Sequence, residues 1–189
     1  MSVMARSVDD LSEYAARNRV KYLFFWGHQA ERDGSAGAGC LSQWWPSRFT
    51  TEGHSFASAE HYMMWRKAVL FGDEAMAERI LVAPHPKVAK ALGGRVEHFR
   101  QEEWDAHRYE IVVAGNLAKF GQDDELRDYL LTTGERVLVE ASPLDRIWGI
   151  GLGRDDPRAA DPRRWRGTNL LGFALMDVRE SLRHQSSAG

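Results

Sequence analysis

The chain has 189 residues, which is the usual size of one domain and allows two only if both are small. Hydrophobic residues make up 43% of the sequence and charged residues 28%, a balance that excludes an intrinsically disordered chain. The formal net charge of −2 excludes an overall basic field that would attract nucleic acid or anionic membranes, and leaves only a local basic patch open.

Cys40 is the only cysteine, so the fold cannot depend on an internal disulfide bond. No apolar run approaches the roughly 20 residues that a membrane-spanning helix needs. The first ten residues include two acids and lack the apolar core of a signal peptide. These features predict a cytoplasmic protein without a membrane partner.

Capping residues, turn residues and hydrophobic periodicity divide the chain into helices, short strands and loops. In chain order they predict a helix over 7–19, a strand over 21–26, a glycine-rich loop over 29–39, extended chain with a turn over 40–56, helices over 60–71, 73–83, 86–93, 101–120 and 123–133, a strand over 136–140, a loop over 155–166 and a helix over 168–183.

Helices outnumber strands in this pattern, and the alternating strand–helix rhythm of a doubly wound sheet is absent. The predicted fold class is therefore α+β, mainly helical, in a single compact domain with a few short strands. The expected boundaries are an N-terminal helical extension over residues 1–20, a domain over 21–184 and a disordered tail over 185–189.

Glu60 and Lys67 are seven residues apart in the predicted helix over 60–71. Seven residues make two helical turns, so the two side chains point in nearly the same direction. A solvated ion pair is one interpretation. However, the helix is apolar around most of its circumference, which indicates burial. A buried carboxylate with a nearby lysine has a perturbed pKa and marks a candidate site.

Two glycine-rich segments near the C-terminus are further candidates. Asp145 lies three residues before Trp148 and Gly149, which could place a carboxylate beside an aromatic wall where glycine lets a ligand approach the backbone. In the segment 167–172, free amides at the start of the last helix could hold an anion, and Asn169 offers a donor and an acceptor. A tight turn with a packed indole and an ordinary capped helix are the alternatives.

Other motifs argue against several kinds of chemistry. The seven histidines show no metal-site spacing, and the glycines at 149, 151 and 153 do not have the spacing of a dinucleotide fingerprint. No nucleophile elbow or phosphate-binding Gly-Lys-Ser/Thr loop occurs in the sequence. Cys40 has no evident base, so we expect it to be packed rather than nucleophilic. We expect no metal and no cofactor.

An ordered set of segments extends over roughly residues 22 to 183. Its members are 24–26 (FFW), 41–44 (LSQW), 56–62 (FASAEHY), Lys67, Trp104, 116–120 (NLAKF), 138–142 (LVEAS), Asp145 with 148–151 (WGIG), and 167–172 (GTNLLG). Taken together, this set resembles the NADAR (YbiA-like) family. The chain departs from the family at Gln43-Trp44, where asparagine and phenylalanine are common. The departure keeps an amide and an aromatic ring but changes the pocket wall.

The resemblance implies a YbiA-like fold and an N-glycosidase, a hydrolase of N-glycosyl compounds. Similar proteins hydrolyse the bond between ribose C1 and the amino group of early riboflavin-pathway pyrimidines, and others remove ADP-ribose from guanine in nucleic acid. We expect a small nucleotide-like substrate, a phosphoribosylaminopyrimidine intermediate of riboflavin biosynthesis. ADP-ribosylated guanine in nucleic acid, or a non-catalytic module that binds ADP-ribose or NAD, are the alternatives. The oligomeric state stays open.

The family's catalytic residues match Glu60 and Lys67, and its pocket tryptophan and aspartate match Trp104 and Asp145. We hypothesise that the neutral Lys67 amine attacks ribose C1, that Glu60 moves protons, and that Asp145 binds sugar hydroxyls or stabilises positive charge at C1. The lysine needs a lowered pKa, which burial favours and a close Glu60 carboxylate opposes.

The remaining candidates would contact the substrate rather than react with it. An indole can stack on the leaving base, and an arginine such as Arg66 or Arg146 can hold a phosphate through two hydrogen bonds. The expected substrate-binding residues are Trp26, Gln43, Trp104, Trp148, Gly149 and Asn169.

Overall fold

The computed structural model describes residues 5–187, so residues 1–4 of the expected extension and 188–189 of the expected tail lie outside the described residues. By its internal contacts the chain divides into two compact units. Unit 1 consists of Met1–Ser42 and Glu125–Gly189, and unit 2 is the continuous segment Gln43–Asp124.

The described residues form seven α-helices, four short strands and two 3-10 helices, which confirms the mainly helical α+β class. In chain order the elements are α1 (Val8–Arg17), β1 (Tyr22–Phe25), η1 (Ala38–Leu41), β2 (Phe49–Thr51), β3 (His54–Phe56), α2 (Ala59–Leu70), α3 (Glu74–Leu81), α4 (Pro86–Gly93), α5 (Gln101–Gly121), α6 (Asp124–Thr132), β4 (Val137–Glu140), η2 (Pro162–Arg164) and α7 (Leu170–Ser187).

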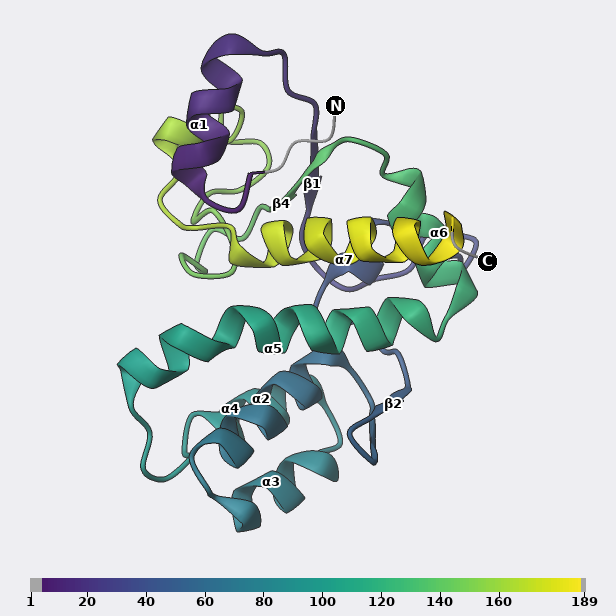
Figure 1. Ribbon diagram of the computed structural model, residues 1–189, viewed down its shortest axis with the longest axis vertical. Helices are drawn as coiled ribbons and strands as arrows, with labels where there is room; N and C mark the ends of the chain where they lie inside the picture. The colour runs from purple at the N-terminus through teal and green to yellow at the C-terminus, as the bar shows by residue number, and fades with distance from the viewer. Residues whose placement is uncertain (1–4, 188–189) are drawn as a thin grey trace. The chain divides into compact units, whose positions relative to one another are not determined.

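Unit 1 is built on a pair of parallel strands. β1 and β4 pair in the register that sets Tyr22 opposite Val137 and Phe25 opposite Glu140. Helix α7 packs on β4 and crosses the strand pair (Figure 1). The first three residues of β4 are buried, as expected for a strand covered by a helix. The strand pair places the loop that follows β4, with Asp145 and Trp148, at the start of α7.

Unit 2 is a helical group in which α2 contacts α3, α4 and α5. Helix α5 packs on α2, and α3 and α4 contact each other as well (Figure 1). The β2–β3 hairpin completes the unit and turns at Glu52 and Gly53, which have positive φ values of 51° and 78°. Two consecutive positive φ values are typical of the tight two-residue turn that matches the twist of a hairpin.

Helix α2 has the ends that the sequence predicts. The Ser58 hydroxyl accepts a hydrogen bond from the amide of His61 and so caps the first turn, and Gly72 with a φ of 70° follows the last turn. Every residue from 59 to 65 is buried, which confirms the predicted burial of this helix. The helix that carries Glu60 and Lys67 is therefore a core element of unit 2.

Neighbouring helices approach α2 closely at two glycines. A Cβ atom added to Gly93 of α4 would lie 2.1 Å from Sδ of Met64, and one added to Gly115 of α5 would lie 2.4 Å from Cδ1 of Tyr62. Neither distance is compatible with a side chain larger than hydrogen. These contacts fix where α4 and α5 lie against the helix of the candidate site.

Several element boundaries differ from the prediction. α1 ends at Arg17, and residues 38–41 form a 3-10 helix where the end of the glycine-rich loop and the start of extended chain were expected. α7 continues to Ser187. Residues 185–187 of the expected disordered tail are therefore helical. Cys40 is fully buried, as predicted for a packed thiol. Within residues 5–187, none of the helices combines the length and the apolar character needed to cross a bilayer.

Candidate functional site

Lys67 lies near the end of α2 in an aromatic setting within unit 2. Its Nζ donates a hydrogen bond to the carbonyl of Gly93 over 2.9 Å. The same atom lies 4.1 Å from the ring centroid of Phe99 and 5.7 Å from that of Trp104. Trp104 is only 8% exposed and is held in the first turns of α5. The lysine head group is thus placed by one carbonyl and two aromatic rings.

Burial lowers the pKa of Lys67 below its ordinary value of 10.5. The sequence alone left open whether burial or a close Glu60 carboxylate would dominate. Seven residues along the helix separate the two groups by about 10 Å of axial rise. The direction of the shift shows that burial prevails, and it increases the share of neutral, nucleophilic amine near pH 7.

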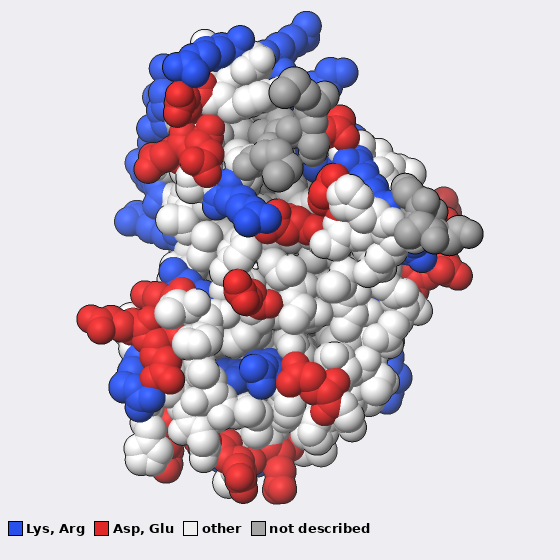
Figure 2. Space-filling view, viewed as in Figure 1, with Lys and Arg blue, Asp and Glu red and all other residues white. Residues whose placement is uncertain are grey.

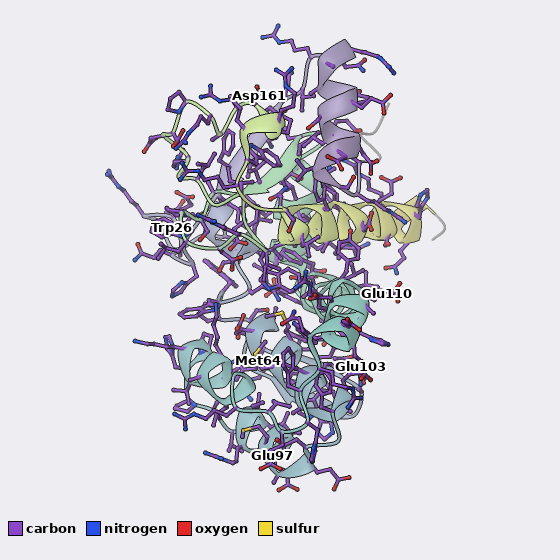
Figure 3. All side chains as sticks on the ribbon, turned by 90° about the vertical axis from the view of Figure 1, so that its left-hand side faces the viewer. Trp26, Met64, Glu97, Glu103, Glu110 and Asp161 are labelled. Carbon is purple, nitrogen blue, oxygen red and sulfur yellow. The ribbon has the colours of Figure 1, made fainter. Side chains whose placement is uncertain are left out.

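The acceptor for Lys67 comes from the end of helix α4. Gly93 is the last residue of that helix, where carbonyl groups lack partners within the helix and carry partial negative charge. Because Gly93 has no side chain, its backbone approaches Met64 of α2 and brings the carbonyl to Lys67. Met64 lies among the helices of unit 2 (Figure 3).

Glu60 lies in the first turn of α2 and is only 3% exposed. Its amide donates a hydrogen bond to the carbonyl of Gln43 over 2.9 Å. The Gln43 side chain is buried as well, and its Oε1 accepts a hydrogen bond from Nδ2 of Asn116 over 2.7 Å. The predicted catalytic glutamate and the predicted Gln43 are therefore connected through the backbone.

Asn116 of α5 adds a polar group that the sequence did not single out as a site residue. Its Nδ2 also donates to the carbonyl of Val112 over 2.8 Å, which fixes the orientation of the amide. Its Oδ1 is buried and accepts no hydrogen bond within the described part of the chain. A buried acceptor of this kind can bind a donor on a ligand or a water molecule.

His61 follows Glu60 and is fully engaged in holding the helix start. Its Nε2 lies 3.0 Å from the carbonyl of Ala83, and its Nδ1 lies 2.7 Å from the hydroxyl of Ser58. A carbonyl can only accept, so Nε2 donates and Nδ1 accepts from the hydroxyl, which is the pattern of a neutral imidazole. Burial lowers the pKa of His61 and favours the same form. This histidine supports the helix start rather than carrying protons.

Arg66, one of the two arginines considered for phosphate, is already paired. Its Nη1 lies 3.3 Å from Oε2 of Glu52. The other oxygen of that carboxylate accepts a hydrogen bond from the hydroxyl of Tyr62 over 2.6 Å. Burial and the neighbouring Glu52 raise the pKa of Tyr62 well above its usual range. Arg66 therefore stabilises the hairpin against α2.

Asp145 lies in unit 1 and holds its own loop. Its Oδ1 accepts hydrogen bonds from the amides of Ile147 and Trp148 over 2.8 and 2.7 Å. Its carbonyl accepts from the amide of Gly151 over 2.9 Å. The carboxylate thus shapes the segment that carries the half-buried Trp148, and its second oxygen makes no hydrogen bond to residues 5–187.

Asn169 and Gly149 are buried in the same loop region of unit 1. The Asn169 side chain accepts from the amide of Glu140 over 3.0 Å and donates to the carbonyl of Leu138 over 2.9 Å. A Cβ at Gly149 would lie 2.8 Å from the carbonyl oxygen of Glu140. Both predicted substrate-binding residues thus join this loop and α7 to strand β4. Trp26, labelled in Figure 3, is 67% exposed at the end of β1.

The prediction of free amides at the start of α7 is wrong. The amides of residues 168, 169, 170 and 171 donate to the carbonyls of residues 146, 149, 147 and 148 over 3.0 to 3.2 Å. The loop after β4 supplies these carbonyls, so the amides of residues 168–171 are not left to hold an anion. Sequence reasoning could not foresee this, because the two segments are about twenty residues apart in the chain.

Three residues of unit 2 escaped the sequence prediction of the site: Gly93, Phe99 and Asn116. The sequence marks Gly93 only as the last residue of the predicted helix over 86–93, and Phe99 lies between that helix and the next. Asn116 belongs to the segment 116–120 that carries the family resemblance, and this membership was the available signal. In the described residues, no group of three His, Cys, Asp or Glu side chains is placed to hold a metal ion.

Comparisons with known proteins agree with this architecture. The chain is 44% identical over 165 residues to N-glycosidase R617 of Acanthamoeba polyphaga mimivirus, covering 85% of this chain and 95% of that protein. It is 31% identical over 138 residues to N-glycosidase YbiA of Escherichia coli (strain K12), covering 73% and 76%. The NMR structure of E. coli YbiA matches with a TM-score of 0.72 at 26% identity, covering 91% and 90% of the two chains.

A family model described as the NADAR domain matches residues 24–183. The names of the relatives agree with the expected enzyme class, hydrolases of N-glycosyl compounds. The match covers most of the chain, from β1 to the last turns of α7. The chain therefore belongs to the NADAR domain family.

Proposed function

We propose that this protein hydrolyses the bond between ribose C1 and the exocyclic amine of a nucleotide-like substrate, and that this substrate is a phosphoribosylaminopyrimidine intermediate of riboflavin biosynthesis. The observation that carries the proposal is the setting of Lys67. A primary amine with a pKa lowered by burial, fixed between Phe99 and Trp104, is suited to attack an electrophilic sugar carbon.

The reaction begins with an aminal carbon. The substrate carries a ring oxygen and an exocyclic nitrogen on C1, so opening of the ribose ring gives an imine at that carbon. The Lys67 amine adds to C1, and the bond to the base nitrogen breaks with the electron pair leaving on the base. The product is an imine between Nζ and the open sugar. Water then adds to C1, the lysine departs as a free amine, and the sugar closes again.

Glu60 supplies the protons in this scheme. The leaving amine needs a proton, and the attacking water must lose one, so a single carboxyl group can act in both halves of the reaction. A general acid–base group of this kind increases the rate of the chemical step by a factor of about 10² to 10⁴. Burial of Glu60 in the first turn of α2 supports this role because the helix backbone fixes the carboxyl group. Trp104 offers a ring on which the base can stack.

The test compares two substrates with one protein preparation. We expect release of the pyrimidine from the ribosylaminopyrimidine phosphate and little release of guanine from ADP-ribosylated guanosine. Preferred release of guanine would assign the protein to ADP-ribose removal instead. Tight binding of ADP-ribose or NAD without release of either base would indicate a non-catalytic module.

Borohydride reduction during turnover tests the lysine adduct. We expect mass spectrometry to find the reduced sugar on the peptide that contains Lys67. Lys67→Ala should abolish the adduct, and Lys90→Ala, which alters an exposed lysine of α4, should leave it unchanged. If Lys67→Ala retained most of the activity, direct attack by water assisted by Glu60 would replace the imine route.

Glu60→Gln should slow turnover by about 10²-fold or more, whereas Glu78→Gln at an exposed position should not.

A further inference from the structure

A groove in unit 1 lies between the start of α1 and the start of α7. It encloses about 450 Å³, which is within the roughly 300–1,000 Å³ of small-molecule sites. Its charged lining residues are Arg6, Asp9, Arg146 and Arg166, and Trp165 forms part of its wall. In Figure 2, Lys and Arg side chains lie over the part of unit 1 that contains α1, together with a group of acidic side chains. The lining thus carries more positive than negative charge.

Arg146 and Arg166 are held side by side by the backbone. A Cβ added to Gly151 would lie 3.1 Å from Cγ of Arg146 and 3.0 Å from Cβ of Arg166, so both side chains pass the same glycine. The amide of Arg166 donates to the carbonyl of Ile150 over 2.9 Å, and the carbonyl of Arg146 accepts from the amide of Thr168 over 3.0 Å. These bonds fix the backbone at both arginines.

The two arginines differ from their neighbours in having no carboxylate partner. Arg158 forms two hydrogen bonds with Asp156, and Arg163 forms two with Asp161. Within residues 5–187, Arg146 and Arg166 make neither an ion pair nor a hydrogen bond through the guanidinium group.

The other charged groups near the groove, including the lining residue Asp9, make no ion pair with Arg146 or Arg166 within residues 5–187. Arg6 lies 3.4 Å from Asp177 and is thereby partly compensated. Asp156 is close enough for Arg166 to lower its pKa, but both of its oxygens are bound by Arg158. Together with Arg6, Arg146 and Arg166 give the groove three arginines against one lining carboxylate, Asp9, and an oxyanion bound by guanidinium groups would reduce this excess of positive charge.

Trp165 provides a rigid aromatic surface at the same groove. Its Nε1 donates to the carbonyl of Ala159 over 2.8 Å, and the ring meets the edge of Tyr22 at a centroid distance of 6.3 Å. These contacts hold the indole in one orientation. A fixed indole beside two arginines matches a ligand that combines a flat ring with a phosphate group.

We propose that this groove binds the phosphate of a nucleotide-sized ligand, with Arg146 and Arg166 holding the phosphate and Trp165 contacting the base. The proposal uses no residue of α2, although Arg146 is also a candidate for the phosphate of the glycosidase substrate. Its test requires no turnover, so its failure can be distinguished from failure of the proposed function. The same phosphate chemistry could come from a mononucleotide or from inorganic phosphate, and the volume of the groove together with Trp165 favours the mononucleotide.

The test is an NMR titration of the full chain with AMP, adenosine, inorganic phosphate and a ten-nucleotide single-stranded DNA. We expect AMP to shift the Trp165 indole and Gly151 amide signals. Adenosine and inorganic phosphate should each bind at least about tenfold more weakly than AMP. Arg146→Ala and Arg166→Ala should each weaken AMP binding by about tenfold or more. Arg163→Ala, at a locally paired arginine, should change it less than about twofold.

Four outcomes would overturn the proposal. Equal affinity for adenosine and AMP would remove the role of the phosphate, and equal affinity for phosphate and AMP would remove that of Trp165. Unchanged AMP binding in both arginine variants would place the ligand elsewhere. Binding of the DNA without measurable affinity for AMP would assign the groove to a nucleic-acid backbone. Circular dichroism of each variant separates loss of binding from loss of fold.

Discussion

The contact between Gly93 and Met64 leads to a quantitative prediction for Gly93→Ala. The new methyl group would lie 2.1 Å from Sδ, 2.9 Å from Cγ and 3.1 Å from Cβ of Met64. Met64 is buried, so its side chain cannot swing into solvent. The end of α4 must therefore move away from α2, and the carbonyl of Gly93 moves with it.

The expected cost follows from this overpacking. Extra methyl groups in a well-packed core cost about 1–3 kcal/mol. For a chain of this size, each kcal/mol corresponds to about 2–4 °C in Tm, so Gly93→Ala should lower the Tm by about 2–12 °C. Displacing the acceptor of Lys67 should also slow formation of the borohydride-trapped adduct, by up to about 10²-fold for a shift near 1 Å.

Gly94→Ala is the matched control. Gly94 has a φ of −73°, and a Cβ there would find its nearest atoms at 3.5 and 3.7 Å. This substitution should leave trapping unchanged and stabilise the fold by about 0.4–1 kcal/mol, because alanine restricts the unfolded chain. Thermal unfolding and trapping are measured for both variants. Equal Tm and equal trapping in Gly93→Ala and the wild type would refute the argument.

Three further predictions concern single side chains. Lys67→Met should abolish trapping yet raise the free energy of unfolding at pH 7, because the folded-state pKa of Lys67 lies below its unfolded value. Urea unfolding should show this gain shrinking as the pH rises toward about 10.5. His61 also has a lowered pKa in the folded protein, so the unfolded chain binds a proton there more readily and the free energy of unfolding should fall as the pH drops below about 6.5. Urea unfolding of the wild type and of His61→Asn should show a smaller fall in the variant. Asn169→Ala should cost about 2–5 kcal/mol in the same assay, because it leaves the amide of Glu140 and the carbonyl of Leu138 without their partner. A loss below about 1 kcal/mol would contradict this structural role for Asn169.

Local chemistry explains which parts of the fold the sequence could predict. Ser58 and Asp73 cap helices as expected because a side-chain oxygen reaches an amide two or three residues ahead. Gly72 ends α2 as expected because its positive φ is easy only for glycine. Such interactions lie within one helical turn, so they are visible in the order of residues.

Interactions between distant segments were not predictable in the same way. The pairing of β1 with β4 joins strands that are more than a hundred residues apart in the chain. Each strand has four residues, and so short a hydrophobic pattern does not identify the strand with which it pairs. The contact of Phe99 with Lys67 depends on how the segment before α5 folds over α2. For the candidate site, the sequence predicted Glu60 and Lys67 on one buried helix, whereas the groups around them emerged only from packing.

The parallel pairing of β1 and β4 also bears on the order in which the chain folds during synthesis. The aromatic residues of β1, from Tyr22 to Phe25, leave the ribosome well before their partners at 137–140 are made. At about 5–20 residues per second the delay is on the order of ten seconds. The continuous segment 43–124 is complete within that time and can fold first. Until β4 arrives, an aromatic strand has an open edge, which makes it a preferred site for a chaperone on the nascent chain.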